Sequence, residues 1–268
     1  MPASLLENHP LSTQPKPGRY SKGLMWFRRD LRTHDNAALF YALKHCEQVH
    51  CVFVYDKTIL DALTNKTDRR VEFIWESCMA LKTKLQGFGG DLHLMYDHAE
   101  TAIPELATKL GVQAVFTNKD YEPAAIHRDI TVGKTLQGKG IELFRFKDQA
   151  IFEEDEVLTQ AGKFFSVFTP FKNACLKKLD EFHLTPYPSE ARVGSLAKDS
   201  GLPAPSLEDM GFKRTNLLDM IKPGEEGALD AFEDFLNRMD KYKVARDFPA
   251  IKGVSYLSVH NRFGTISI

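Results

Sequence analysis

The chain has 268 residues, of which 43% are hydrophobic and 26% are charged, and its formal net charge is −1 at pH 7. This composition is typical of a soluble globular protein, and the near-zero charge excludes a global basic field that would attract nucleic acid. No apolar run reaches the length of a membrane span and the four cysteines form no C-x-x-C pair, so we expect a cytoplasmic protein outside the membrane, without a disulfide scaffold or metal site.

Residues 1–22 are polar and contain prolines, and we expect them to form a disordered extension. From residue 23 to about 150, short apolar runs alternate with longer segments of helical period. In chain order these are a strand at 24–27, a helix at 36–45, a strand at 50–55, a helix that Asp68 caps and Gly87 ends, a strand at 91–96, a helix at 103–110, a strand at 114–117, a helix at 123–136 and a strand at 141–146. Strands that alternate with helices form βαβ units, so we predict an α/β fold with a Rossmann-like, doubly wound, parallel five-stranded sheet over residues 23–150.

The alternation stops after Ile151. A helix is predicted from Val167 to Leu179, which makes residues 151–184 a helical end of the α/β domain. Residues 185–226 include a Pro-, Ser- and Gly-rich stretch and are predicted to be an interdomain linker. An amphipathic helix from Ala228 to Tyr242 then leads into a last unit over residues 227–268, in which a new helix begins at Val259.

Three arginines and two aspartates follow the first predicted strand, in the run from Arg28 to Asn36. Ligands of open α/β sheets bind at the carboxyl ends of strands, so this run could hold a ligand. The alternative is an Arg–Asp network with Asp35 or Asn36 capping the next helix, and the residues alone favour it. No G-x-G-x-x-G follows the strand and no G-x-x-x-x-G-K-[ST] occurs, so NAD and P-loop sites lose their main support. The run from Asn118 to Glu122 fits a ligand contact and a turn into the next helix equally well.

Hydroxyl, glycine and basic residues crowd into the stretch from Tyr242 to Ile268. It holds Arg246, Gly253 and three hydroxyl residues between 255 and 258. Hydroxyls and exposed backbone N–H groups can cradle phosphate oxygens, so this stretch is predicted to bind an anion.

Taken together, these segments resemble the DNA photolyase/cryptochrome family. Residues 25–32 with Asp35-Asn36 are similar to its opening W-F-R-x-D-L-R-x-x-D-N, and Tyr121-Glu122 with Arg128-Asp129 are similar to its Y-E…R-D element. Residues 167–171 match V-F-T-P-F. Residues 246–250 and 253–258 match the R-D-F-P-A and G-T-S-x-L-S elements that begin the flavin domain. The resemblance covers residues 23–268.

The resemblance implies a photolyase antenna domain, a linker and the start of an all-α FAD-binding domain. It further implies a deoxyribodipyrimidine photolyase-like protein, a carbon–carbon lyase in which light-excited FAD drives the splitting of cyclobutane pyrimidine dimers in damaged DNA. We expect a monomer. The alternatives are a cryptochrome-type blue-light sensor and a standalone nucleotide- or chromophore-binding Rossmann-like module.

Site residues follow by position. The resemblance implies that Arg246 lies at the DNA backbone and that FAD, largely through its phosphates, contacts Tyr242, Val254, Ser255, Tyr256, Leu257 and Ser258. No catalytic residue and no metal ligand is expected within the chain. Val254 stands where the family usually has Thr, and losing a hydroxyl bond to a charged phosphate costs roughly 1.5–3 kcal/mol.

Two further expectations concern the cofactors. Folate-using members carry an Asn-Glu pair where this chain has Ala124 and Ala125, which argues against methenyltetrahydrofolate as the antenna chromophore and leaves its identity open. The family's remaining flavin contacts would follow Ile268. The chain is therefore expected to be the amino-terminal part of a photolyase, truncated early in the FAD domain, inactive alone and unable to retain FAD.

Overall fold

The computed structural model describes residues 20–198 and 203–268. Most of the extension predicted over residues 1–22 lies outside these ranges. The end of that prediction is wrong, because Tyr20 to Lys22 open the first strand and pair with the second, Tyr20 beside Cys46.

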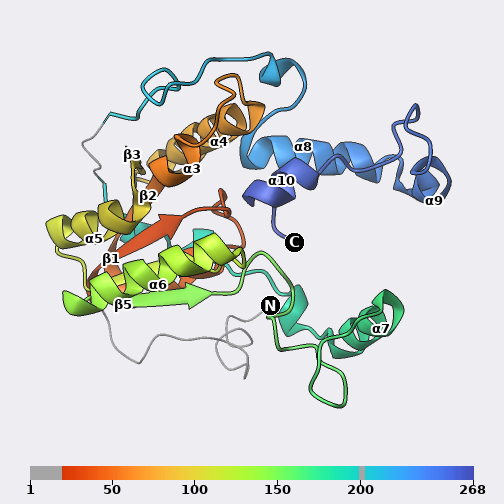
Figure 1. Ribbon diagram of the computed structural model, residues 1–268, viewed down its shortest axis with the longest axis horizontal. Coiled ribbons are helices and arrows are strands. Elements are labelled where there is room, and N and C mark those ends of the chain that lie inside the picture. The colour runs from red at the N-terminus through yellow and green to blue at the C-terminus, as the bar shows by residue number, and fades with distance from the viewer. Residues whose placement is uncertain (1–19, 199–202) are drawn as a thin grey trace.

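In the described part of the chain, five parallel strands form one sheet (Figure 1). They are β1 (Tyr20–Phe27), β2 (Cys46–Asp56), β3 (His93–Asp97), β4 (Ala114–Asn118) and β5 (Glu142–Phe146). The strand order is β3-β2-β1-β4-β5, so the chain winds outward from β1 to one edge and then from β4 to the other. The predicted Rossmann-like, doubly wound sheet is confirmed, and its switch point lies between β1 and β4.

Helices cover both faces of the sheet (Figure 1). On one face lie α2 (Ala37–His45) and α4 (Arg69–Gly87), and on the other lie α5 (Ala99–Leu110) and α6 (Pro123–Gly138). Because neighbouring strand residues point to opposite faces, Met25 packs in the first cluster and Trp26 in the second. Asn36 and Asp68 cap α2 and α4 through their side chains, and Asp68 was predicted for that role. The short helix α3 (Lys57–Leu60) has no counterpart among the predicted elements.

The segment predicted as a linker contributes to the core. It follows η1 (Phe182–Leu184) and holds the 3-10 helices η2 (Ser189–Ser195) and η3 (Leu217–Asp219). Leu207, Met210 and Phe212 are buried in the cluster that contains α2 and α4. Burial of this apolar surface holds the segment against the sheet domain. The domain boundaries themselves stay predictions.

The last helices lie to one side of the sheet (Figure 1). They are α7 (Phe168–Lys178), α8 (Gly224–Leu236), α9 (Tyr242–Ala245) and α10 (Ser258–Phe263), and η4 (Met239–Lys241) stands before α9. The helix predicted from Ala228 to Tyr242 is wrong in its second half. Arg238 has φ −140°, outside the helical region, and its guanidinium bonds two backbone carbonyls of a later loop, so a tertiary contact ends the helix.

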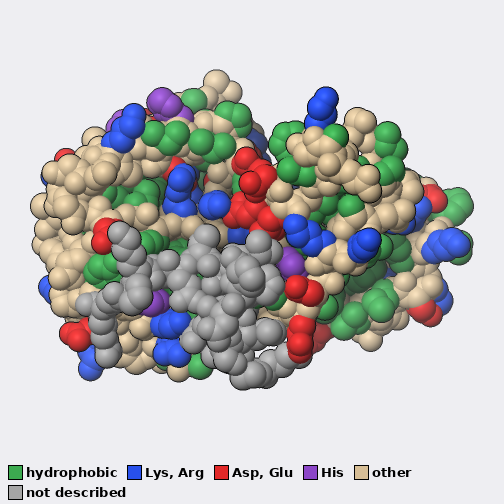
Figure 2. All heavy atoms as spheres, turned by 90° about the horizontal axis from the view of Figure 1, so that it is seen from below, with side chains coloured by type: hydrophobic (Ala, Val, Ile, Leu, Met, Phe, Trp, Pro, Cys, Tyr) green, Lys and Arg blue, Asp and Glu red, His purple; other side chains and the backbone are tan. Residues whose placement is uncertain are grey.

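Hydrophobic side chains are exposed at the end of the molecule that carries α7, α8 and α9, as Figure 2 shows. Helix α7 buries none of its residues, and Phe168 and Leu176 are exposed. Among the residues with described positions, no helix has the length and apolar character needed to cross a bilayer.

Candidate functional site

The arginine run after β1 is tied into the switch point of the sheet. Arg28 donates to Asp129 at 2.5 Å and to the carbonyl oxygen of Asn118. Asp30 accepts the backbone N–H of Arg28 at 2.6 Å and the amide of Asn118 at 2.7 Å. Burial raises the pKa of Asp30. These side chains bond to one another within the chain. The predicted Arg–Asp network is therefore a better interpretation of this run than a ligand site.

Arg32 makes the second half of this network. Both of its terminal nitrogens donate to Asp148, at 2.7 and 3.1 Å, and both side chains are almost completely buried. Burial raises the pKa of Asp148 to about 6 despite the guanidinium beside it. Asn36 caps α2 by accepting the N–H of Leu39 at 3.0 Å, so of the two predicted caps it is Asn36 that takes the role.

The run from Asn118 to Glu122 is also engaged within the chain. Asn118 accepts the backbone N–H of Ala38 at 3.0 Å, Lys119 pairs with Glu153 at 2.7 Å, and Asp120 pairs with Arg29 at 3.1 Å. The contacts support the turn interpretation.

Arg28 and Arg128 lie against the same indole ring. Their guanidinium carbons are 4.8 and 5.2 Å from the centre of Trp26, which suits cation–π contact. Burial, and then the charge of Arg28, lower the pKa of Arg128.

The arginine run after β1 also bonds the carboxyl segment, which we define as residues 258–268. Leu31 donates its N–H to the carbonyl of Phe263 at 3.2 Å, and Arg29 donates to the carbonyl of Arg262 at 3.1 Å. Arg32 donates to the carbonyl of Gly264 at 3.2 Å. The loop that the sequence marked as ligand-prone thus fastens α10 to the sheet domain.

A second site lies between α8 and α9. A solvent-open hollow of about 400 Å³ is lined by Phe235, Met239, Tyr242 and Ser255, and we call it the α8–α9 hollow. Tyr242 meets Phe235 edge to face, with ring centres 5.9 Å apart. Two of the six residues predicted to contact FAD, Tyr242 and Ser255, are therefore brought together across 13 positions of sequence.

Ser255 comes from the loop of residues 252–258, which we call the cradle loop. Gly253 is pressed against α9, because an added Cβ would stand 2.6 Å from the carbonyl oxygen of Ala245. Tyr256 has φ +58°, a left-handed conformation that few residues with a Cβ adopt. Within the described residues, the backbone N–H groups of Ser255 and Tyr256 donate to no acceptor. Two adjacent free donors in a turned backbone suit an anion.

The other predicted residues are placed differently. Val254 is half-buried, Leu257 packs its side chain inside and Ser258 is exposed at the start of α10, and none of the three lines the α8–α9 hollow. Arg246 is about half exposed, and its guanidinium carbon lies 5.7 Å from the ring centre of Tyr242.

Sequence reasoning missed Phe235 and Met239 as site residues. Met239 precedes Tyr242 by three positions and Phe235 precedes it by seven, so the period of the predicted amphipathic helix could have placed both on the side of Tyr242. Arg238 carries no such signal, because the two carbonyls that it bonds besides its partner Asp234 lie in the cradle loop.

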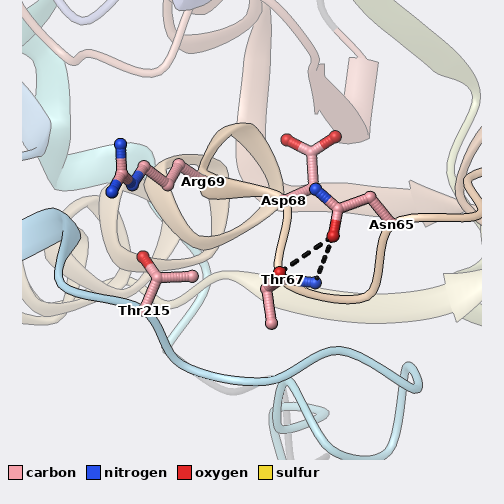
Figure 3. Close-up of a pocket in the computed structure, with 5 residues that line it drawn as sticks. All are labelled: Asn65, Thr67, Asp68, Arg69 and Thr215. Atoms are coloured by element: carbon pink, nitrogen blue, oxygen red, sulfur yellow. Dashed lines mark hydrogen bonds between the residues drawn. The ribbon is translucent and has the colours of Figure 1, made fainter.

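A further open hollow of about 400 Å³ lies where α4 begins (Figure 3). Its Asn65 side chain turns back to accept from the N–H and hydroxyl of Thr67, at 3.0 and 2.9 Å. Asp68 caps α4 and Arg69 donates to Asn216 at 2.7 Å. These groups satisfy one another, so we assign this hollow no chemistry.

Comparison with known proteins shows that the chain is similar to DNA photolyases. The family model described as DNA photolyase matches residues 23–191. An uncharacterized 31.6 kDa protein in the atpI 5′ region of Synechococcus sp. (strain PCC 6716) is 33% identical over 93% of this chain and 87% of its own length. The deoxyribodipyrimidine photo-lyase of Agrobacterium fabrum is 31% identical over 91% of this chain and 51% of its own.

Solved structures give the same result. A class III photolyase from Agrobacterium tumefaciens superimposes with a TM-score of 0.79 at 29% identity, over 97% of this chain and 53% of the photolyase. A cryptochrome from Synechocystis sp. PCC6803 superimposes at 0.78 and 22% identity, over 92% and 53%, which shows a shared fold. The chain spans about half the length of the photolyases that it matches.

Proposed function

The chain belongs to the DNA photolyase family, and we propose that it serves the light-driven, FAD-dependent splitting of cyclobutane pyrimidine dimers in DNA. The observation that carries the proposal is the meeting of Tyr242 and Ser255 at the α8–α9 hollow, because both were assigned to FAD by sequence position alone. The chain supplies an antenna-type domain and one wall of the flavin site.

The residues present fit part of an FAD molecule. The free N–H groups of Ser255 and Tyr256 suit phosphate oxygens, and the ring of Tyr242 offers an apolar wall beside them. A ligand site usually buries about 70–90% of its ligand, and an open hollow buries less, so the chain alone is expected not to retain FAD through purification and to bind added FAD only weakly. When bound, FAD supplies the electron transfer that opens the dimer.

DNA contact is assigned to Arg246. Its side chain is about half exposed beside Tyr242, and its nearest carboxylate, Asp247, is 3.5 Å away and itself exposed. An accessible guanidinium binds a phosphate without reading sequence, which suits an enzyme that recognises damage rather than a base sequence.

The proposed antenna chromophore is a molecule other than methenyltetrahydrofolate. Ala124 is exposed on α6 and Ala125 is buried, and neither methyl side chain can hydrogen-bond a pterin.

Two alternatives are less well supported. The likeness to the cryptochrome is one of fold at 22% identity, whereas the relatives named deoxyribodipyrimidine photo-lyase reach 32% identity. A standalone nucleotide-binding module would use the arginine run after β1, and that run is engaged by Asp129, Asp148 and the carboxyl segment.

A chimera tests the proposal. Residues 1–268 are followed by the remaining half of the Agrobacterium fabrum photolyase, and the purified chimera is given FAD and a thymine-dimer oligonucleotide. We expect bound flavin and loss of dimers in light but not in darkness. A folded chimera that binds flavin without repairing dimers would exclude the repair function, and one that binds no flavin would exclude the assigned flavin wall.

A further inference from the structure

We propose that Arg238 is a positioning residue for the cofactor: it holds the cradle loop in the shape that presents the N–H groups of Ser255 and Tyr256 to the flavin phosphates. This inference rests on the proposed function. It concerns a residue that touches neither the α8–α9 hollow nor any ligand.

Arg238 stands just after α8 and reaches across to the cradle loop. Its Nε donates to the carbonyl of Lys252 at 2.9 Å, and its Nη2 donates to the carbonyl of Val254 at 2.7 Å. Its Nη1 donates to the carboxylate of Asp234, one helical turn earlier, at 2.5 Å. The side chain is only 16% exposed. One planar guanidinium therefore joins the end of α8 to two carbonyls of the loop.

The two bonded carbonyls flank the tightest point of the loop. Gly253 lies between them, pressed on the backbone of Ala245. Arg238 holds the peptide between residues 252 and 253 through the carbonyl of Lys252, and the peptide between residues 254 and 255 through the carbonyl of Val254. Because the carbonyl of Val254 belongs to the same peptide plane as the N–H of Ser255, the bond that fixes the carbonyl also fixes the direction of that N–H.

A second cation steadies the anchor on α8. Lys252 pairs with Asp234 at 2.9 Å, and its hydrogen bond, followed by that of Arg238, lowers the pKa of Asp234. An exposed ion pair of this kind adds little by itself, so the effect of Arg238 should lie in the two carbonyl bonds.

Geometry explains why arginine is needed. A guanidinium presents donors in several fixed directions within one plane, whereas a lysine ammonium is one point on a flexible stem. A loop ordered before binding spares the ligand the entropy of ordering it. Lysine at 238 would keep the charge near Asp234 and lose the carbonyl bonds.

The test compares backbone order and flavin binding in the same samples. The wild type, Arg238→Lys and Arg238→Gln are labelled with ¹⁵N, and order parameters are measured for residues 253–258 without ligand. Arg238 pairs with Asp234 and lies 5.5 Å from the ring centre of Phe235. The matched control is Arg214→Lys, because Arg214 likewise pairs with one carboxylate, Glu76 at 2.7 Å, and lies over one ring, that of Trp75. FAD is then titrated and the shifts of residues 254–258 give Kd.

We expect wild-type order parameters near the rigid value of about 0.85, and values toward about 0.6 in both Arg238 variants. We expect Kd for FAD to rise about tenfold in Arg238→Lys, the equivalent of about one lost hydrogen bond, and to stay unchanged in Arg214→Lys. Amide shifts of α4 identical to the wild type establish that the variants are folded. If Arg238→Gln fails to fold, Arg238→Lys alone tests whether Arg238 orders the cradle loop.

Unchanged loop order in a folded Arg238 variant would overturn the inference. So would a loosened loop that binds FAD as tightly as the wild type, because ordering would then not matter for the cofactor. A wild-type chain whose 254–258 amides ignore FAD would instead overturn the proposed function, while the order parameters would still decide whether Arg238 shapes the loop.

Discussion

Gly264 lies so close to Arg29 that an added Cβ would overlap the carbonyl oxygen of Arg29. Its φ of +64° is in the left-handed region that glycine adopts without cost. Because of this approach, the carbonyl of Gly264 can accept a bond from Arg32 at 3.2 Å. A single glycine thus allows the carboxyl segment to dock on the loop after β1.

Gly264→Ala should destabilise that docking. A Cβ in the left-handed region costs roughly 1–2 kcal/mol, and the overlap with Arg29 adds to this. Urea unfolding measures the loss. Gly211→Ala is the matched control, because Gly211 has φ +78° and open space around it and so pays the backbone cost alone. Equal losses in the two variants would mean that the close approach contributes nothing.

Arg32→Met should lower the free energy of unfolding by about 3–5 kcal/mol, because it leaves the buried carboxyl of Asp148 without its partner. Adding Asp148→Asn should restore part of the loss, since no unpaired charge then remains. Chemical denaturation of the two single variants and the double variant gives the coupling. Additive losses would contradict a coupled pair.

The stability of the wild type should fall in weak acid because of His260. Its ring is fully buried, meets Phe73 edge to face at 5.4 Å, and has a pKa lowered by burial. The unfolded imidazole takes up a proton below about pH 6.5 and the folded one resists, so the free energy of unfolding falls as pH falls.

His260→Gln removes this titration while the other histidines remain. As the pH falls from about 7 to 5, the free energy of unfolding of the wild type should therefore fall more than that of the variant. A difference that stays constant over this range would show that His260 does not titrate differently in the folded state.

Val254→Thr should tighten FAD binding about tenfold or more, if the restored hydroxyl reaches a phosphate. Val254 is half-buried, and threonine has nearly its shape, so the fold should not change. Fluorescence titration of FAD measures the affinity, with Val254→Ala as the control for side-chain size. An unchanged Kd would mean that this position uses only its backbone.

Arg246→Gln should weaken DNA binding by the chimera equally for all sequences and reduce the salt dependence by about one phosphate contact. Binding curves at several salt concentrations give both quantities. Arg192→Gln, at an exposed position in η2, controls for the loss of a positive charge. If the variant bound DNA with the salt dependence of the wild type, Arg246 would not be a DNA contact.

The sheet domain could be predicted from the sequence because the patterns that mark its strands and helices are local. The apolar run of β2 and the Asp68 cap of α4 each predict their element without knowledge of the rest of the chain. Tyr242 and Ser255 were assigned to FAD by motif position, and the structure brings both to one hollow. The break in the helix before Tyr242 was not accessible, because the partners of Arg238 that end it lie 14 and 16 residues later.

The sequence by itself determined the α/β class, the parallel sheet and the family, because hydrophobic period, caps and motif order are properties of neighbouring residues. Only the tertiary structure decided what the arginine run after β1 does. Its guanidinium groups could face a ligand or carboxylates of the chain, and that choice depends on where Asp129, Asp148 and Gly264 come to lie after folding. Long-range pairing of buried charge decided it, since a buried guanidinium must find its acceptors within the fold.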